Sequence, residues 1–365
     1  MGEAITKPRV RRGRQSGAPT ISDVAALAGV STMTVSRVIN KEGSVRETTR
    51  DTVLAAIERL NYAPNRAARS LAGAAQLRMA LLYSNPSAAY LSEFLVGSLD
   101  QAGRGDIQLV VEKCEGDGDE RRVAQRLIDS GIDGIILPPP LCDSRAILDY
   151  LTQVGVPMVV VATGKPADGA TAVSIDDRAA AQAMTRHLIA LGHTRIGFIV
   201  GNPNQTASEQ RLAGFRAALA DAGIADDPAL VVDGLFTYRS GLDAAEALLD
   251  LDPPPTAIFA SNDDMAAASV AVAHRRGFDV PGDLTVCGFD DSALATTVWP
   301  ELTTIHQPIA DMSRRAVDLL AERIRARRSD AREPIQRVVL DYTLIRRQSD
   351  ASPRRRPRAA LRVER

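Results

Sequence analysis

GVSTMTVSRVIN, residues 29–40, decides how the amino-terminal part of this sequence folds. Val35, Val38 and Ile39 repeat at the i, i+3, i+4 spacing of a helix with one buried face, and Ser31 is placed to cap its start. The opposite face carries small and polar side chains, so the helix is slim enough to enter a B-form major groove. The stretch therefore predicts the turn and second helix of a helix-turn-helix unit.

The segments on either side complete a three-helix unit. Residues 20–23, Thr-Ile-Ser-Asp, have a capping-box pattern, and Gly29 ends this first helix in a tight turn. A third helix is expected over residues 47–60, where Val53, Ile57 and Leu60 recur at helical spacing. Because any small three-helix unit could show such periods, the pattern alone is weak evidence for DNA binding.

Residues 61–73, NYAPNRAARSLAG, begin with a proline stop and an asparagine cap. They predict about two helical turns, which are too short to be stable alone. Leu71 stands beside arginine and serine, a setting that suits a wedge inserted into the minor groove. The alternative is a linker whose leucine packs against the rest of the protein.

Charge is strongly partitioned along the 365 residues, whose net charge is −1. Residues 1–75 carry 12 Lys and Arg against 6 Asp and Glu, residues 346–365 carry 8 against 2, and the body between them has a net charge of −13. A basic end on an acidic body predicts phosphate contact at that end alone. The length and the 45% hydrophobic content predict two or three folded units.

Several function classes lack support in the sequence. An apolar run of about 18 residues and a signal-peptide core are both missing, which predicts a cytoplasmic protein. Cys114, Cys142 and Cys287 are widely spaced, so we expect them to be buried thiols. The four histidines lack metal-ligand spacing, and we expect neither a metal nor a cofactor. Neither G-x-S-x-G nor G-x-x-x-x-G-K occurs, which argues against an enzyme.

From Arg78 onward, short apolar runs alternate with amphipathic segments, the pattern of parallel sheets covered by helices on both faces. Eight strands are expected, at residues 79–83, 107–111, 134–137, 158–161, 196–200, 230–232, 257–260 and 284–288. They are too many for one sheet of the usual size. Two similar lobes are therefore expected, with a ligand between the carboxyl ends of their strands.

Residues 20–73 resemble the amino-terminal domain and hinge of the lactose/galactose repressor family, through D-V-A-x-x-A-G-V-S-x-x-T-V-S-R-V-I-N and then L-N-Y-x-P-N-x-x-A-R-S-L. The body resembles the two-lobed periplasmic-binding-protein fold of this family, through LGHTRIG, RLAGF, ASNDDMA, GFDD and LTTI, which begin at residues 191, 211, 260, 288 and 302. The implied fold is a small all-α helix-turn-helix domain plus a two-lobed α/β effector domain.

The resemblance also implies how the chain is divided. A disordered basic arm (1–19) precedes the helix-turn-helix domain (20–63), the hinge helix and linker (64–77), the effector-binding and dimerisation domain (78–345) and a basic disordered tail (346–365). The chain should cross between the lobes three times, near residues 174–176, 304–307 and 331–334.

By the same resemblance, one set of residues contacts DNA. Thr32, Met33 and Arg37 hold base-reading positions, whereas Ser31, Thr34, Ser36 and Asn40 face the DNA backbone or pack inward. Arginine suits a guanine, whereas methionine offers only apolar contact, for example to a thymine methyl group. Asn65, Arg66 and Leu71 are the contacts expected from the hinge, with Leu71 as the minor-groove wedge.

A second set is expected to bind the effector. Sugar sites combine charged and amide groups for hydroxyls with an aromatic face for the ring. The candidates, most of them close behind strand ends, are Arg211, Asn262 and Asp290, the ring-stacking Phe236, and Asn85 and Tyr90 from the first lobe. The alternatives are helix-capping Asn and Asp and a surface Arg. Residues 204–206 could line the mouth of the cleft. Pro138-Pro139-Pro140 replaces the polar strand end that some family members use for ligand contact. Trp299 lies near the cleft or is a packing residue.

The implied function is transcriptional regulation in the cytoplasm, at the nucleoid. One recognition helix reads too few base pairs, so a homodimer on palindromic double-stranded operator DNA is expected, released by a small-molecule effector, most simply a sugar. One alternative is a purine-type ligand that acts as corepressor. Another, from a different class, is a sugar-binding transport component, which would need a signal peptide and no DNA-reading domain.

Overall fold

The computed structural model describes residues 19–39, 45–60, 62, 76–85, 87–115, 118–331 and 335–354. It separates into two compact units, Met1–Gln76 and Leu77–Arg365, which are taken in turn below. The site predictions for Asn40, Asn65, Arg66 and Leu71 fall outside the described residues, as do those for the amino-terminal arm and most of the hinge.

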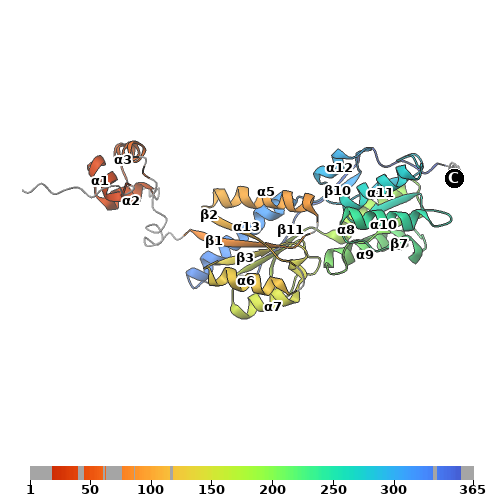
Figure 1. Ribbon diagram of the computed structural model, residues 1–365, viewed down its shortest axis with the longest axis horizontal. Helices are drawn as coiled ribbons and strands as arrows, with labels where there is room; N and C mark the ends of the chain where they lie inside the picture. Colours follow the sequence, from red (N-terminus) through yellow and green to blue (C-terminus); the bar gives the residue numbers. More distant parts are fainter. Residues whose placement is uncertain are drawn as a thin grey trace, which may run out of the picture. The chain divides into compact units, whose positions relative to one another are not determined.

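Three helices form the first unit: α1 (Ile21–Ala28), α2 (Thr32–Ile39) and α3 (Glu47–Arg59) (Figure 1). The Asp23 carboxylate accepts a hydrogen bond from the Thr20 backbone nitrogen at 2.7 Å, and Gly29 ends α1 with a φ of 66°. Val24, Val35 and Val53, one from each helix, lie in a common core. The helix-turn-helix prediction is confirmed.

Two parallel sheets form the centres of two lobes in the second unit (Figure 1). The strand order is β11-β5-β4-β3-β1-β2 in the first lobe and β7-β6-β8-β9 in the second. First-lobe strands are β1 (Leu77–Tyr83), β2 (Ile107–Lys113), β3 (Gly134–Leu137), β4 (Met158–Val161), β5 (Thr171–Ser174) and β11 (Arg337–Val339). Second-lobe strands are β6 (Ile196–Ile199), β7 (Val231–Val232), β8 (Ala257–Ala260) and β9 (Thr285–Cys287). β10 (Thr304–His306) pairs antiparallel with β12 (Thr343–Ile345).

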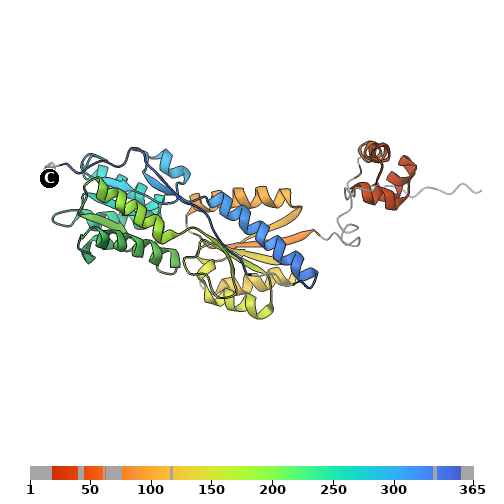
Figure 2. The same ribbon diagram turned by 180° about the vertical axis from the view of Figure 1, so that it is seen from behind.

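Helices cover both faces of each sheet, as the alternating pattern predicts. In the first lobe, α5 (Ala88–Arg104) and α13 (Ile309–Arg328) pack on one face, and Figure 2 shows α13 in blue lying across the sheet. The other face is covered by α6 (Asp119–Asp129) and α7 (Arg145–Val154). In the second lobe, α8 (Asp177–Ala190) and α9 (Thr206–Asp221) lie opposite α10 (Tyr238–Leu249) and α11 (Asp263–Arg275). Shorter helices are η1 (Leu141–Asp143), η2 (Pro228–Leu230) and α12 (Ala293–Thr297).

The third predicted crossing between the lobes is wrong. After α13 the chain stays in the first lobe, because β11 pairs in parallel with β5 at the sheet edge. It leaves only beyond Val339 and then pairs with the other crossing segment through β12 and β10. β11 has three residues and is too short to show a periodic signal in the sequence. Without this strand, the crossing is predicted too early, at residues 331–334.

Residues 346–354, predicted to belong to the basic tail, instead pack on the second lobe. The Val286 backbone nitrogen donates to the Ser349 carbonyl at 2.9 Å, and Thr303 Oγ1 donates to the Asp350 carboxylate at 2.6 Å. Ser349 is fully buried. Small polar residues carry no hydrophobic pattern, which is why the sequence places the boundary too early.

Two smaller expectations can also be compared with the structure. The three cysteines are buried free thiols, as expected. Trp299 is 74% exposed, so the interpretation of it as a packing residue is wrong. Among the helices of the described residues, none is both long and apolar enough to cross a membrane.

Candidate functional site

Helix α2 turns a polar face toward solvent. Met33 is 63% exposed and Thr32 and Arg37 are exposed too, whereas Val35 and Val38 are buried on the opposite face. The predicted base-reading positions are therefore all exposed on a short, narrow helix, a geometry that fits a major groove.

Ser31 and Thr34 are engaged with each other at the start of α2. Ser31 Oγ accepts a hydrogen bond from the Thr34 backbone nitrogen at 3.1 Å and lies 2.9 Å from Thr34 Oγ1. This is the expected helix cap. Ser31 and Thr34 thus stabilise the start of the helix, and Ser36 is half-buried.

One cavity in the second unit gathers all six predicted effector residues. They lie just beyond the carboxyl ends of strands or on the helices that follow: Asn85, Tyr90, Arg211, Phe236, Asn262 and Asp290. The cavity is also lined by Ser87, Pro139, Ala162, Gln205, Ala207 and Gln307. Its volume is about 30 Å³, room for at most a few water molecules, so a sugar-sized ligand needs the lobes to move apart.

Arg211, 4% exposed, organises the charges of this cavity. Its Nε donates to Asp177 Oδ1 at 2.8 Å, and its Nη1 donates to the Ser261 carbonyl at 2.5 Å and lies 3.8 Å from Asp290 Oδ1. The guanidinium carbon is 3.6 Å from the centroid of the Phe289 ring, a cation–π contact. Arg211 is thus the deep anchor of the site, and the surface-arginine alternative is wrong.

Carboxyl groups crowd around this single guanidinium. Burial raises the pKa of Asp290 well above its usual value; Arg211 opposes the rise and Asp263 adds to it. Burial likewise raises the pKa of Asp177 and of Asp264, although Arg211 and Ser87, respectively, oppose the shift. Of these carboxyl groups Asp290 lines the cavity, where Asn85, Gln205 and Gln307 add amide oxygens that can accept from a ligand with hydroxyl donors.

Two buried polar atoms in this cavity have no hydrogen-bond partner among the described residues. They are the Tyr90 hydroxyl and Gln307 Oε1, although Gln307 Nε2 donates to Asp290 Oδ1 at 2.6 Å. A buried polar group without a partner costs about 1–3 kcal/mol. A hydroxylated ligand would supply the partner to both atoms, so Gln307 joins the candidate residues although the sequence does not single it out.

Phe236 and Asn262 are held in place by the fold. The Phe236 ring lies against Gly201, where an added Cβ would be 1.9 Å from Cζ. Asn262 caps α11, because its Oδ1 accepts from the Met265 nitrogen at 3.0 Å, and its Nδ2 donates to the Phe236 carbonyl at 3.1 Å. The helix-capping alternative thus describes Asn262 correctly, even though the residue also lines the cavity.

The buried Asp263, next to this cavity, predicts a pH-dependent stability. Burial raises its pKa from 3.8 to about 7, against hydrogen bonds from Thr304 and Ser292. The folded state therefore keeps a proton that the unfolded chain has lost, and the free energy of unfolding falls as pH rises from about 4 to about 7, by about 4 kcal/mol for a shift of this size.

Asp263→Asn should remove this dependence. Urea unfolding of the full chain, followed by circular dichroism at pH 5 and pH 8, should show a smaller difference between the two pH values than in the unmodified protein. Equal differences in the two proteins would contradict the assignment.

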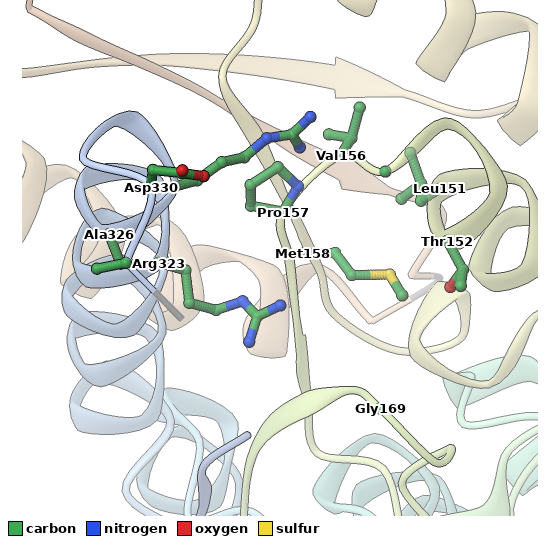
Figure 3. Close-up of a pocket in the computed structure, with 12 residues that line it drawn as sticks. Leu151, Thr152, Val156, Pro157, Met158, Gly169, Arg323, Ala326 and Asp330 are labelled. Atoms are coloured by element: carbon green, nitrogen blue, oxygen red, sulfur yellow. The ribbon is translucent and has the colours of Figure 1, made fainter. Parts of the chain in front are cut away.

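A larger hollow, of about 470 Å³, lies at the opposite end of the first lobe (Figure 3). It is bounded by the carboxyl end of α13 and by the loop from α7 to β4, and Arg323, Pro157 and Met158 point into it in Figure 3. Arg323 Nη1 donates to Thr171 Oγ1 at 3.0 Å. None of the predicted effector residues lines this hollow, so the cleft between the strand ends is the candidate ligand site.

Comparison with known proteins connects both sites to described families. Residues 20–65 match the model "Bacterial regulatory proteins, lacI family", and residues 185–349 match the "Periplasmic binding protein-like domain". The HTH-type transcriptional regulator DegA of Bacillus subtilis is 36% identical over 90% of this chain and 97% of its own length. The solved "transcriptional regulator CelR-cellobiose complex" is 34% identical, with a TM-score of 0.69 over 91% of this chain and 99% of that one. The lac repressor dimer bound to operator and an anti-inducer is 27% identical, with a TM-score of 0.75 over 92% and 100%.

Proposed function

Because the chain belongs to the lacI family of bacterial regulatory proteins, it is a DNA-binding transcriptional regulator, and we propose that it is a dimeric repressor that a sugar releases from a palindromic operator. The observation that carries this proposal is the cleft, where six residues predicted from separate stretches of sequence line one cavity. We place the protein at the nucleoid, in the cytoplasm.

The chemistry of the cleft supports a carbohydrate ligand. Asp290 and Gln307 present acceptor oxygens, Asn85 and Tyr90 face them from the first lobe, and Phe236 supplies an aromatic ring. Vicinal hydroxyls can donate to paired oxygens while the apolar face of a sugar covers an aromatic ring. The similar CelR structure contains cellobiose, which adds support for this ligand class.

Calorimetric titration of the purified protein with a panel of mono- and disaccharides tests the ligand class. At least one sugar should bind with a Kd below about 1 mM, a typical limit for a metabolite ligand (~4 kcal/mol). If no sugar binds while a purine base does, the ligand class proposed here is wrong.

Exposed apolar residues support a dimer. In the first lobe Val96 and Leu99 are 61% and 56% exposed on α5, beside Val111 on the edge strand β2. In the second lobe Leu235, Tyr238 and Trp299 are exposed as well. Large exposed apolar side chains on neighbouring elements mark association surfaces. The occupant we propose is a second copy of this chain, by analogy with the lac repressor dimer.

We propose that each copy reads one half-site. Thr32, Met33 and Arg37 would contact bases from the exposed face of α2, and Ser31, Thr34, Ser36 and Asn40 the DNA backbone or the helix itself. From the hinge, Asn65, Arg66 and Leu71 would contact the operator centre, with Leu71 as a wedge.

Arg37→Ala should weaken binding to the preferred operator by roughly 1–3 kcal/mol and relax the base preference at one position of each half-site. The reason is the loss of a bidentate contact to guanine. Binding to a library with that position randomised measures the effect, and Arg59→Ala, on the exposed side of α3, is the control. A loss that is uniform across all sequences would make Arg37 a phosphate contact instead.

A further inference from the structure

Helix α9 receives its amino-terminal cap from the opposite lobe. The residue before the helix, Gln205, makes no side-chain capping bond, although the first backbone N–H groups of a helix need acceptors. Asp143, in η1 of the first lobe, supplies one: its Oδ2 accepts from the Thr206 backbone nitrogen at 2.8 Å and its Oδ1 from Thr206 Oγ1 at 2.9 Å. A carboxylate at this end also matches the helix dipole.

The loop after β4 completes this contact between the lobes. Thr163 Oγ1 donates to Asp143 Oδ1 at 2.6 Å, and the backbone nitrogens of Gly164 and Lys165 donate to Thr206 Oγ1 at 2.8 and 3.2 Å. An added Cβ on Gly164 would lie 2.8 Å from the Thr206 carbonyl oxygen, so glycine is what allows the loop to come this close. Donors and acceptors from both lobes therefore converge on Thr206.

Among the described residues, two further polar contacts between the lobes differ from this one. Ser87 Oγ donates to Asp264 Oδ2 at 2.7 Å, but Ser87 lines the ligand cavity and so belongs to the effector site. Lys165 Nζ pairs with Glu209 at 2.7 Å between two exposed side chains, a type of ion pair that contributes little. Asp143 joins the lobes through a helix end and does not line the cavity.

We propose that Asp143 is a positioning residue that holds the effector cleft closed by capping α9 across the lobes. It acts through Thr206 on the helix that carries Arg211 and Ala207 to the cavity. When the lobes separate, the hydrogen bond between the Thr206 N–H and the Asp143 carboxylate breaks. When the lobes close, this charge-assisted hydrogen bond forms again. That this closure affects ligand binding rests on the proposed function, whereas the contact that holds the lobes together does not.

Hydrogen exchange of the full-length protein, without sugar or DNA, tests the proposal directly. Asp143→Ala should speed exchange of the Thr206 amide about 10-fold or more, and Asp143→Asn should give an intermediate value. Lys165→Ala, which removes only the exposed ion pair, is the matched control and should leave exchange unchanged.

Distances between the lobes give a second readout that a purely structural role would not move. Spin labels at Cys substituted for Arg122 and Arg239, both exposed and one on each lobe, avoid the buried native cysteines. Asp143→Ala should lengthen the mean distance between the labels at a temperature well below the melting temperature of the variant. An unchanged distance and unchanged exchange, or equal changes in Lys165→Ala, would overturn the proposal. Should Asp143→Ala fail to fold, Thr206→Val, which keeps the backbone N–H and loses every hydrogen bond of Oγ1, decides by the same two measurements.

Discussion

Asp290→Asn is expected to abolish the effector response while leaving operator affinity unchanged. Asp290 lies just after β9, deep in the cavity, near Arg211 and bonded to Gln307. Its φ of 109° lies in the left-handed half of the Ramachandran map, where Asn is among the better tolerated replacements, and Asn keeps an oxygen for the Gln307 amide. The variant should therefore fold, and lose only acceptor capacity toward the ligand.

The expected loss is about 3 kcal/mol of sugar binding, or roughly 100-fold in Kd, because Asn replaces one acceptor oxygen with an NH2 donor and so leaves a buried hydroxyl of the sugar without its acceptor. Calorimetry with the sugar found in the panel measures it, and operator binding with and without that sugar measures the response. Asp291→Asn is the matched control, since Asp291 pairs with Arg347 and does not line the cavity. A normal response in Asp290→Asn would remove this residue from the site.

Leu99→Asp is expected to break the dimer and, with it, tight operator binding. Leu99 is 56% exposed on α5 and is not part of the lobe's own core, so a monomer should remain folded. A buried unpaired carboxylate at a subunit interface is strongly unfavourable. A dimer that contacts two half-sites binds with about 10²–10⁴-fold higher affinity than a monomer that contacts one. Operator affinity should therefore fall on the order of 100- to 1,000-fold.

Analytical ultracentrifugation and operator titration of Leu99→Asp measure these two effects. Val154→Asp is the control, because Val154 is similarly exposed but lies at the end of α7, on the other face of the first-lobe sheet. A dimer of normal stability in Leu99→Asp would show that α5 does not form the interface.

The sequence predicts those parts of the fold whose signal is local. β3, β4 and β8 begin and end where their apolar runs do, and α1 ends at Gly29 as expected. β5, β10, β11 and β12 have three or four residues each and carry too few apolar positions to show a period. The wrong position of the third crossing follows from missing β11.

Some residues of the candidate site could be predicted from the sequence and others could not. Arg211, Asn262 and Asp290 follow strands that the sequence reveals, and family resemblance adds Phe236, Asn85 and Tyr90. Gln307 ends a segment that the sequence marks as a crossing between the lobes but not as part of the site, because β10 before it is not predicted as a strand. The contact of Asp143 with Thr206 joins residues 63 positions apart through a helix end, and no local pattern encodes such a contact.

The most direct test of the whole account is one titration. Full-length protein is first used to select duplexes from random DNA, and fluorescence anisotropy then follows its affinity for the selected duplex as each sugar of the panel is added. The account predicts selection of a palindrome and loss of its binding with one sugar but not with the others. Failure to select any sequence, or a selected duplex whose binding every sugar leaves unchanged or strengthens, would contradict it.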